Sequence, residues 1–470
     1  MSIVLTKRDV FWGYFAQFFS MASGIIVLPL VLRMLTPEEI GMNYLMLTVG
    51  SMVSLFDFGF APQFGRNISY IFSGAQVLKK EGVEINENHS QEINYKLLST
   101  MIHTARYVYQ ILAIVALLVM LSFGTLYIFK VTNGFENVNN SLIIWIVYSL
   151  STFFNIYYTY YTSLLTGKGL IKESKKAMVY SKIAYITFII IFLLLGLGLL
   201  GVAIANLLSP FVGRVFSKKY FFTVELKDKI NQFTITPEDK SELFKIIWYN
   251  SKKLGLVFIG SYAISKFGMF LAGLYLSLKE VSSYGLMIQL VGIIVTIAGT
   301  LFTIYNPKFA ELKVKNNKKE LLKTFSYSMG VYYSIFLLGS LMLIFLMPGL
   351  LVYIKSNALL PATGILILYL LVTLLERNHS IFSSIIVIGN TVPFVRIALI
   401  SGGLIALLSY ISLSFTTLGI LGLVLAQGVV QLAYNNWKWP LVVCRDFEIS
   451  VFQFVLGSFT ELFKRIKLVL

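Results

Sequence analysis

Residues 10–34 of the chain read VFWGYFAQFFSMASGIIVLPLVLRM, a run in which Arg33 is the only charged side chain. A helix that crosses the hydrocarbon core of a membrane needs about 20 predominantly apolar residues. The run follows Lys7 and Arg8 as a secretory signal would, but it is too long for the apolar part of a signal and has no convincing cleavage site of small residues. We therefore expect a first membrane span that is retained.

The composition of the whole chain agrees with a membrane protein. Of 470 residues, 57% are hydrophobic and 13% are charged, and the mean hydropathy is +0.78. Ordinary globular domains carry about 25% charged residues. These values argue strongly against a soluble, disordered or collagen-like chain of this length. A single cysteine, Cys444, excludes an intrachain disulfide and a multi-cysteine metal site, and three histidines make a histidine-rich metal centre improbable. We expect no metal and no bound cofactor.

Similar apolar runs recur along the chain and predict twelve membrane-spanning helices. They lie at residues 10–34, 40–62, 107–130, 139–165, 183–199, 201–222, 246–277, 283–305, 326–354, 359–388, 393–416 and 418–443. The predicted fold is an all-α integral membrane protein of two six-helix bundles. Its parts are an N-terminal lobe at 1–222, a cytoplasmic linker at 223–245, a C-terminal lobe at 246–445 and an amphipathic cytoplasmic tail at 446–470.

The placement of Lys and Arg tests this helix count. If both termini are cytoplasmic, the segments on the inner side hold 33 of the 39 Lys and Arg residues and those on the outer side hold 4. The remaining two, Lys266 and Arg377, lie inside spans. Cytoplasmic loops of membrane proteins carry an excess of Lys and Arg, so this distribution predicts both the orientation and the alternation of twelve spans.

Local motifs mark where helices begin. Residues 36–39 (TPEE) combine an N-cap, a proline and two acids, so the second helix should start there, and residues 236–239 (TPED) repeat the device before the seventh span. The segment LTPEEI at 35–40 is matched by LSLKEV at 276–281. Two halves of six spans each would be parallel repeats, with the substrate in the cleft between them.

The tail shows a helical stripe of apolar side chains and is expected to lie along the membrane interface rather than cross it. The stripe comprises Phe452, Val455, Phe459, Phe463 and Ile466.

Charged residues inside spans are the first candidates for function, because each costs about 2.5–3.5 kcal/mol at a helix centre on insertion scales. Lys266 lies near the middle of the seventh span, and Glu376, Arg377 and His379 lie in the tenth. One interpretation is a cationic cavity that holds an anionic head group. The other is a structural network, such as an ion pair between Lys266 and Glu376.

Other polar residues admit two interpretations as well. Arg33 and Arg66 are either head-group ligands or side chains that reach the membrane interface. Asp57 is too short to reach far, so it would bind a proton or cation, or pair with Arg66. Tyr157 and Tyr161 belong to a group of tyrosines that is either an aromatic belt, which is favoured, or a set of sugar contacts.

The sequence carries no Walker A motif, no GxSxG elbow and no HExxH motif. The remaining enzymatic alternative is a membrane acyltransferase that uses His379 as its base. A lone intramembrane histidine beside an arginine and a glutamate is more often a member of a polar network. We therefore expect that the chain is not an enzyme.

The opening of the chain resembles that of bacterial O-antigen and polysaccharide flippases, members of the multidrug/oligosaccharidyl-lipid/polysaccharide exporter superfamily. The resemblance rests on LRML at 32–35, TPEEIG at 36–41, SLFDFGF at 54–60, Arg66-Asn67 and the central segment GKGLIK at 167–172. It covers the whole chain in topology, whereas the motifs themselves concentrate in about the first 70 residues.

This resemblance implies two bundles in a V that open alternately to the two sides of the membrane. It implies a polyprenyl-diphosphate-linked oligosaccharide as cargo, carried from the cytoplasmic to the outer leaflet of the bacterial inner membrane, with a proton or sodium gradient as the driving force. Lys266 and Arg377 would then contact the head group, together with Arg33 and Arg66, while Asp57, Glu376 and His379 would form a coupling or structural network. The polysaccharide polymerase and chain-length machinery are the implied partners. A multidrug exporter of the same superfamily is the alternative, although a lumen for cationic drugs should be acidic.

Overall fold

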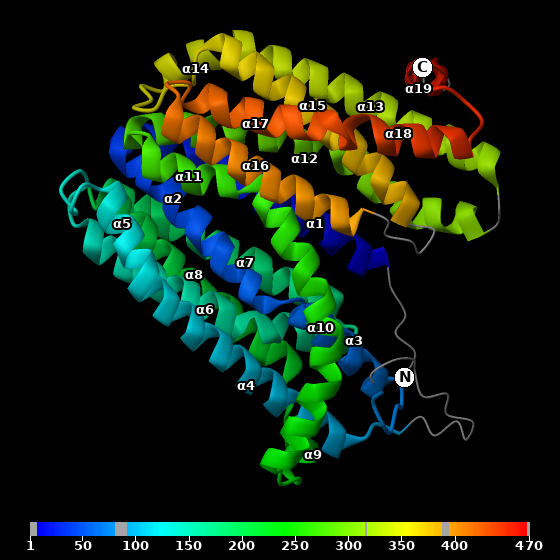
Figure 1. Cartoon of the computed structure of the whole chain (residues 1–470). Helices are drawn as coiled ribbons and strands as arrows, with labels where there is room; N and C mark the ends of the chain where they lie inside the picture. The colour runs from blue at the N-terminus through cyan, green and yellow to red at the C-terminus, as the bar shows by residue number, and fades with distance from the viewer. Residues whose placement is uncertain (1–6, 80–91, 315–316, 388–393, 468–470) are drawn as a thin grey trace. The chain divides into compact units, whose positions relative to one another are not determined.

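The structure is a computed structural model and describes residues 7–79, 92–314, 317–387 and 394–467. The side chains of some helical residues, many of them between 250 and 265, lie outside this description. Throughout the described residues every regular element is a helix (Figure 1). The chain divides into two compact units, Met1–Ile259 (unit 1) and Gly260–Leu470 (unit 2). These units are defined by contacts between residues, whereas the domain limits expected from the sequence were defined by apolar runs. Those limits remain predictions.

Unit 1 contains the first nine α-helices, most of α10, one 3-10 turn and one π segment. They are α1 (Lys7–Met34), α2 (Pro37–Val53), η1 (Ser54–Asp57), α3 (Phe60–Phe72), α4 (Tyr95–Val119), η2 (Met120–Gly124), α5 (Thr125–Val131), α6 (Ser141–Gly167), α7 (Ile171–Leu194), α8 (Gly198–Phe221), α9 (Val224–Asn231) and α10 (Pro237–Ser265).

Unit 2 contains the end of α10 and all the helices that follow. They are α11 (Phe267–Tyr275), α12 (Leu278–Val314), α13 (Lys318–Phe345), α14 (Met347–Tyr353), α15 (Thr363–Val387), α16 (Val395–Phe415), α17 (Ile420–Ala433), α18 (Asn435–Asp446) and α19 (Val451–Lys467).

Each of the twelve predicted runs is occupied by one helix or by consecutive helices. Among the described residues nine helices are long and apolar enough to cross a membrane, and ten if the bent pair Pro37–Asp57 and Phe60–Phe72 forms one span. The predicted runs at 246–277 and 418–443 are each broken once, between α10 and α11 and between α17 and α18. The prediction of an all-α integral membrane protein is confirmed.

The second predicted span, 40–62, is interrupted, and the prediction of one continuous helix there was wrong. After η1 the backbone of Phe58 and Gly59 has φ of 43° and 74°, and α3 then starts in a new direction, bent by 42°. The left-handed conformation suits glycine but is unusual for phenylalanine. Asp57 therefore lies at a helix break.

The predicted helix start at residues 36–39 is confirmed. The Thr36 hydroxyl accepts a hydrogen bond from the Glu39 N–H (3.2 Å), and the Glu39 carboxylate accepts one from the Thr36 N–H (2.9 Å). Ser277 and Glu280 form the same reciprocal pair at the start of α12. The repeated segments at 35–40 and 276–281 thus share a capping box as well as a sequence pattern.

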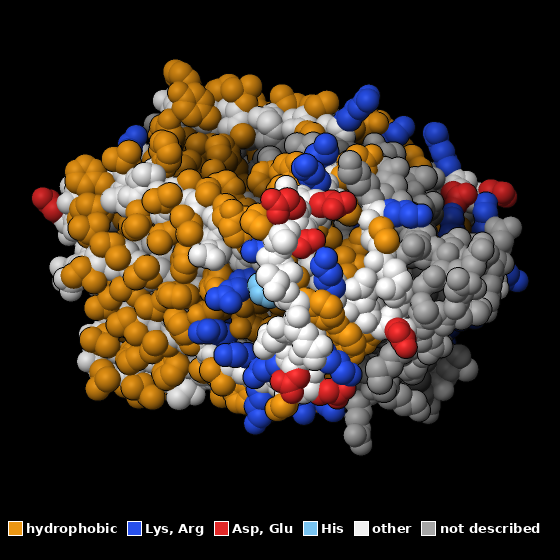
Figure 2. All heavy atoms as spheres, turned by 90° about the horizontal axis from the view of Figure 1, so that it is seen from below, with side chains coloured by type: hydrophobic (Ala, Val, Ile, Leu, Met, Phe, Trp, Pro, Cys, Tyr) orange, Lys and Arg blue, Asp and Glu red, His pale blue; other side chains and the backbone are white. Residues whose placement is uncertain are grey.

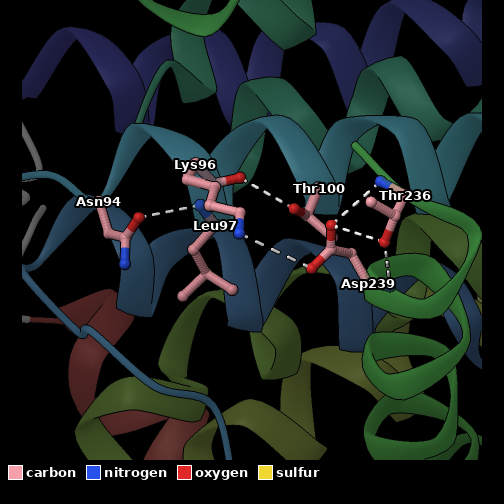
Figure 3. A network of polar contacts seen from close by, with 6 residues as sticks. All are labelled: Asn94, Lys96, Leu97, Thr100, Thr236 and Asp239. Carbon is pink, nitrogen blue, oxygen red and sulfur yellow. Dashed lines mark hydrogen bonds and ion pairs between the residues drawn. The ribbon is translucent and has the colours of Figure 1, made fainter. Parts of the chain in front are cut away.

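The ends of α4 and α10 are joined by a polar network (Figure 3). Asn94 caps α4 by accepting from the Leu97 N–H (2.9 Å), and Thr236 and Asp239 cap each other at the start of α10. Lys96 lies 3.9 Å from the Asp239 carboxylate. The N–H and hydroxyl of Thr236 hold the pKa of Asp239 below its usual value. Both helices therefore begin at the same end of unit 1.

The core of unit 1 surrounds the C-terminal half of α6. A cluster of buried side chains joins α3, α4, α6 and α8 with α9 and the start of α10. Phe60 stacks on Phe244 and Trp248, which anchors the beginning of α10 in this unit. Figure 1 shows α4, α6 and α8 running side by side.

The tail helix α19 packs on unit 2 through one face. Phe454 lies against Phe325 and Phe382. The backbone carbonyl of Ser458 lies so close to Gly330 of α13 that a side chain at Gly330 would collide with it. A second face carries Phe452 and Phe463, which are 72% and 61% exposed, together with other members of the predicted stripe. The side chain of Ile466, the last member, lies outside the described residues. The helix thus carries an exposed apolar face in addition to the apolar face that packs on unit 2.

Candidate functional site

Lys266 stands at the break between α10 and α11. It is the residue that precedes the first turn of α11, with φ of −129° and ψ of −25°, and its side chain is exposed. Within the described part of the chain no carboxylate lies within 4.0 Å of its ammonium group. An exposed cation in an otherwise apolar segment needs an anion or water as its partner.

Arg377, in the middle of α15, is the second cation of this region. It is exposed, and its positive charge acts on that of Lys266 within unit 2. The adjacent Glu376 accepts a hydrogen bond from Gln427 of α17. In the described residues no ion pair links Glu376 to Lys266, so the structural pairing weighed from the sequence is absent in this conformation.

The remaining polar residues of α15 are held by neighbouring helices. The Tyr333 hydroxyl of α13 donates to the Asn378 side chain (2.6 Å). Nδ1 of His379 lies 2.8 Å from the side-chain oxygen of Asn436 in α18. His379 is thus a member of a polar network, which is the structural interpretation offered by the sequence.

The sequence did not draw attention to a row of threonines on α12. Thr296, Thr300 and Thr303 lie on one face at helical spacing, and their hydroxyls bond to carbonyls of their own helix. Thr296 and Thr303 are exposed. Glycines on the same helix, Gly292 and Gly299, have open space where a side chain would be. The spacing of four and then three residues between these threonines was the sequence signal that could have revealed this polar face.

In unit 1, the carboxylate of Asp57 is hydrogen-bonded to a residue 52 positions further along the chain. The Tyr109 hydroxyl of α4 donates a hydrogen bond to its carboxylate, and the Ala61 N–H at the start of α3 lies 3.4 Å from the other oxygen. Arg66 is exposed and bonds to Gln63 of its own helix. The alternative of a pair between Asp57 and Arg66 is therefore not what the described residues display.

A polar face on α6 accompanies these groups. It comprises Asn155, Thr159, Thr162 and Thr166, spaced by four, three and four residues. Asn155 donates a hydrogen bond to the carbonyl of Ser151, within its own helix. A side chain at Gly65 of α3 would contact the Thr166 hydroxyl, so this face runs beside α3.

The other predicted contacts occupy different places. Arg33 is exposed in the last turn of α1. Tyr157 is half-buried and accepts a hydrogen bond from Arg106. Tyr161 is 5% exposed and stacks on Tyr160 with ring centroids 4.3 Å apart, so it packs in the core in this conformation. A sugar role for Tyr157 and Tyr161 stays a prediction.

The chain was compared with known proteins by family model, by sequence and by structure. No family model matches the chain, and no curated protein matches its sequence. Among solved structures, it is similar to an inward-facing multidrug resistance MATE family transporter of the MOP superfamily, with a TM-score of 0.61 and 16% identity over 92% of this chain and 95% of that one. It is also similar to the lipid II flippase MurJ in an inward closed conformation, with a TM-score of 0.60 and 14% identity over 97% and 91%.

A MATE in the straight conformation is a third similar structure, with a TM-score of 0.52 and 15% identity over 94% of this chain and 96% of that one. At these identities the likeness concerns the fold. The chain has the twelve-helix, two-lobe fold shared by these transporters and by the lipid flippase. The solved structures that it resembles are transporters and a lipid flippase.

Proposed function

We propose that this chain is a flippase that moves a polyprenyl-diphosphate-linked oligosaccharide, such as an O-antigen or capsule repeat unit, from the cytoplasmic to the outer leaflet of the bacterial inner membrane. The coarser part of this proposal, a multi-pass transporter or flippase of the MOP type, rests on the fold. The lipid-linked cargo is favoured because one similar structure is a lipid II flippase.

The observation that carries the choice of cargo is the state of Lys266 and Arg377. Both are exposed, both belong to apolar helical segments of unit 2, and neither forms an ion pair among the described residues. A bound anion would be attracted by both cations and would offset the repulsion between them. This attraction is stronger in a poorly screened site than in water. A diphosphate supplies that anion.

The accompanying polar faces suit the rest of such a cargo. Exposed threonines on α12 and on α6 offer hydroxyls that can exchange hydrogen bonds with sugar hydroxyls. Asp57, at a helix break, is the candidate for coupling to a proton or sodium gradient, with Glu376 and His379 as the network in unit 2. Arg33 and Arg66 are further candidate contacts for the head group at either end of the path. The polysaccharide polymerase and chain-length machinery are the proposed partners.

A multidrug exporter remains the second candidate, because the MATE structures share the fold. The two functions demand opposite charge in the transport path, since drugs expelled by such exporters are commonly cations. The deciding experiment uses the full chain in proteoliposomes with a fluorescent polyprenyl-diphosphate oligosaccharide in one arm and a cationic dye in the other. Translocation of the lipid alone supports the proposal, and transport of the dye alone refutes it.

A further inference from the structure

Two arginines on different helices of unit 1 converge on adjacent tyrosines of α6. Arg106 of α4 donates from Nε to the hydroxyl of Tyr157 (3.2 Å). Arg214 of α8 donates from Nη1 to the hydroxyl of Tyr158 (3.2 Å), and its guanidinium lies over the same ring, 5.0 Å from the centroid. The rings of Tyr157 and Tyr158 are 5.3 Å apart. The four side chains thus form one row across three helices.

The charge of this row is not balanced. Among the described residues neither Arg106 nor Arg214 has a carboxylate within 4.0 Å. Lys218 follows Arg214 by four residues on α8 and is exposed, so it lies one turn away on the same side. Each guanidinium has five N–H donors. Tyr157 takes one from Arg106, and Tyr158 and Tyr161 each take one from Arg214. Donors and charge are therefore left over for an anion.

The surroundings of the row are those of a lipid-facing surface. Beside Arg106, Tyr107 is 55% exposed, and Ile111 and Ile114 are each 42% exposed one and two turns further along α4. Beside Arg214, Val215 is 62% exposed. Arg106 directly precedes the apolar run predicted at 107–130, which places it at the level where hydrocarbon gives way to head groups.

Tyr157 faces away from the polar side of α6. Successive residues of a helix are about 100° apart, so Tyr157 and Thr159 point in directions about 200° apart. Tyr157 is directed toward α4, which carries Arg106, and Tyr158 toward α8, which carries Arg214. Thr159 and Thr162 lie on the polar face that runs beside α3. Tyr157 therefore points away from the polar face, whereas Tyr158 is four residues from Thr162 and lies at the edge of that face.

We propose that Arg106, Arg214, Tyr157 and Tyr158 form a binding site for the phosphate head group of an anionic phospholipid. The lipid would belong to the leaflet on the side of the basic loops, with its acyl chains along Ile111 and Ile114 of α4. Guanidinium groups bind phosphate through pairs of parallel hydrogen bonds, and the tyrosines hold both guanidiniums in place. Arg106 is exposed, so the head group can reach it without displacing a helix. The site stands independently of which cargo the chain carries.

The test is lipid binding by the full chain, purified in a neutral detergent and measured by native mass spectrometry. The probes are phosphatidylglycerol, phosphatidylcholine with the same acyl chains, and a polyprenyl diphosphate. The variants are Arg106→Gln, Arg214→Gln and the double substitution. Lys130→Gln, which removes an exposed cation from α5 of the same unit, is the matched control. Thermal unfolding without added lipid shows which variants are folded.

We expect the parent chain and the Lys130→Gln control to prefer phosphatidylglycerol over phosphatidylcholine by about tenfold or more, which corresponds to about 1.4 kcal/mol. The double variant should lose this preference. If it does not fold, Arg106→Lys with Arg214→Lys replaces it, and this variant should keep part of the preference because the charges remain while the bidentate contacts are lost. Equal binding of the two phospholipids by the parent, or an unchanged preference in the variants, would overturn the proposal.

The polyprenyl diphosphate separates this site from a transport site. If it competes with phosphatidylglycerol for the two arginines, and the double variant then fails to transport in vesicles made of phosphatidylcholine alone, the arginines belong to the transport path and the proposal is wrong. Retained transport in those vesicles, together with lost phosphatidylglycerol binding, supports a lipid site on the outer surface of unit 1.

Discussion

The carboxylate of Glu39 accepts a hydrogen bond from the backbone N–H of Leu199, 160 residues further along the chain (3.1 Å). Its other oxygen completes the capping box with Thr36. One acidic side chain therefore satisfies backbone donors at the beginnings of both α2 and α8. Because the N-terminus of a helix carries partial positive charge, the negative charge of Glu39 is stabilised by both α2 and α8. Glu39 ties two spans of unit 1 together at one end.

The first prediction follows from this double contact. Glu39→Ala should lower the free energy of unfolding by more than the roughly 0.5–2 kcal/mol lost with an ordinary N-cap. Glu280→Ala is the matched control, because the described contacts of Glu280 involve only its own capping box. Thermal unfolding in detergent measures both variants. Equal destabilisation of the two would show that the Leu199 contact contributes nothing.

The second prediction concerns Lys266 and assumes a diphosphate cargo. A charged hydrogen bond contributes about 1.5–3 kcal/mol, so Lys266→Ala should weaken transport by roughly 10- to 100-fold. Lys266→Arg should keep part of the activity, since lysine binds phosphate as a point charge, and Lys266→Glu should keep none. Arg377→Lys should fare worse than Lys266→Arg because a bidentate contact is lost.

The assay for these variants is surface polysaccharide in a flippase-null strain, at matched amounts of protein in the membrane. Normal polysaccharide with Lys266→Ala would remove Lys266 from the head-group site.

The third prediction separates charge from hydrogen bonding at Asp57. Asp57→Asn keeps an oxygen for the Tyr109 hydroxyl but removes the negative charge, whereas Tyr109→Phe keeps the charge and removes the donor. If Asp57 couples transport to an ion gradient, Asp57→Asn should reduce transport about tenfold while insertion is unaffected, and Tyr109→Phe should have the smaller effect. Both variants are compared by transport in proteoliposomes with and without an imposed gradient. Full gradient-driven transport by Asp57→Asn contradicts a coupling role.

These predictions draw on relationships that the sequence revealed unevenly. Apolar runs and capping motifs are local, so the twelve runs and the helix starts at Pro37 and Pro237 could be predicted from spacing alone. The break at Phe58 and Gly59 depends on backbone angles that no periodicity encodes. A single Gly within an apolar run is tolerated in many membrane helices, which is why the run appeared continuous.

Partners distant in the chain were the hardest to foresee. Asp57 could be singled out because it is short and charged, but nothing local indicates Tyr109 as its donor. Nothing in the sequence around Arg106 and Arg214 indicates a tyrosine partner, and only the packing of α4 and α8 on α6 brings each to one. Pairing between helices depends on which faces meet, and one sequence does not determine that.

The fourth prediction is a pH dependence at the end of α18. Asp446 pairs with Lys313 (3.1 Å) and Lys318 (3.2 Å). Burial alone would raise the pKa of Asp446, but the hydrogen bonds and charges of the two lysines lower it overall. Because the folded pKa lies below the unfolded value, the stabilisation is complete above about pH 4 and is lost as the pH falls through the folded pKa.

Asp446→Asn should therefore lower the unfolding temperature at pH 7 and make no difference near pH 2. The loss should be below about 1 kcal/mol because the group is partly exposed and screened. Glu448→Gln removes a nearby acid that forms no ion pair among the described residues and serves as the control. A difference between Asp446→Asn and the parent that is the same at both pH values would contradict the prediction.

The fifth prediction tests orientation. Single cysteines at Asn317, and at Asn88, which lies outside the described residues, should react with an impermeant maleimide only from the cytoplasmic side. Those at Asn137 and Asn357 should react only from outside. The parent chain is a suitable background, since Cys444 is 1% exposed and should stay unlabelled. The reverse labelling pattern would overturn the assignment based on Lys and Arg.

The matching capping boxes at Thr36–Glu39 and Ser277–Glu280 have a consequence for the origin of the chain. Gly198, the first residue of α8, and Gly419, the residue before α17, also share a positive φ, 53° and 54°. Both pairs of features suggest duplication of one ancestral half. A half with six spans ends on the side of the membrane where it began, so two copies fused in one gene insert the same way up. Such a fusion would need no reversal of charge in either copy, and an unfused ancestor could have worked as a symmetric pair.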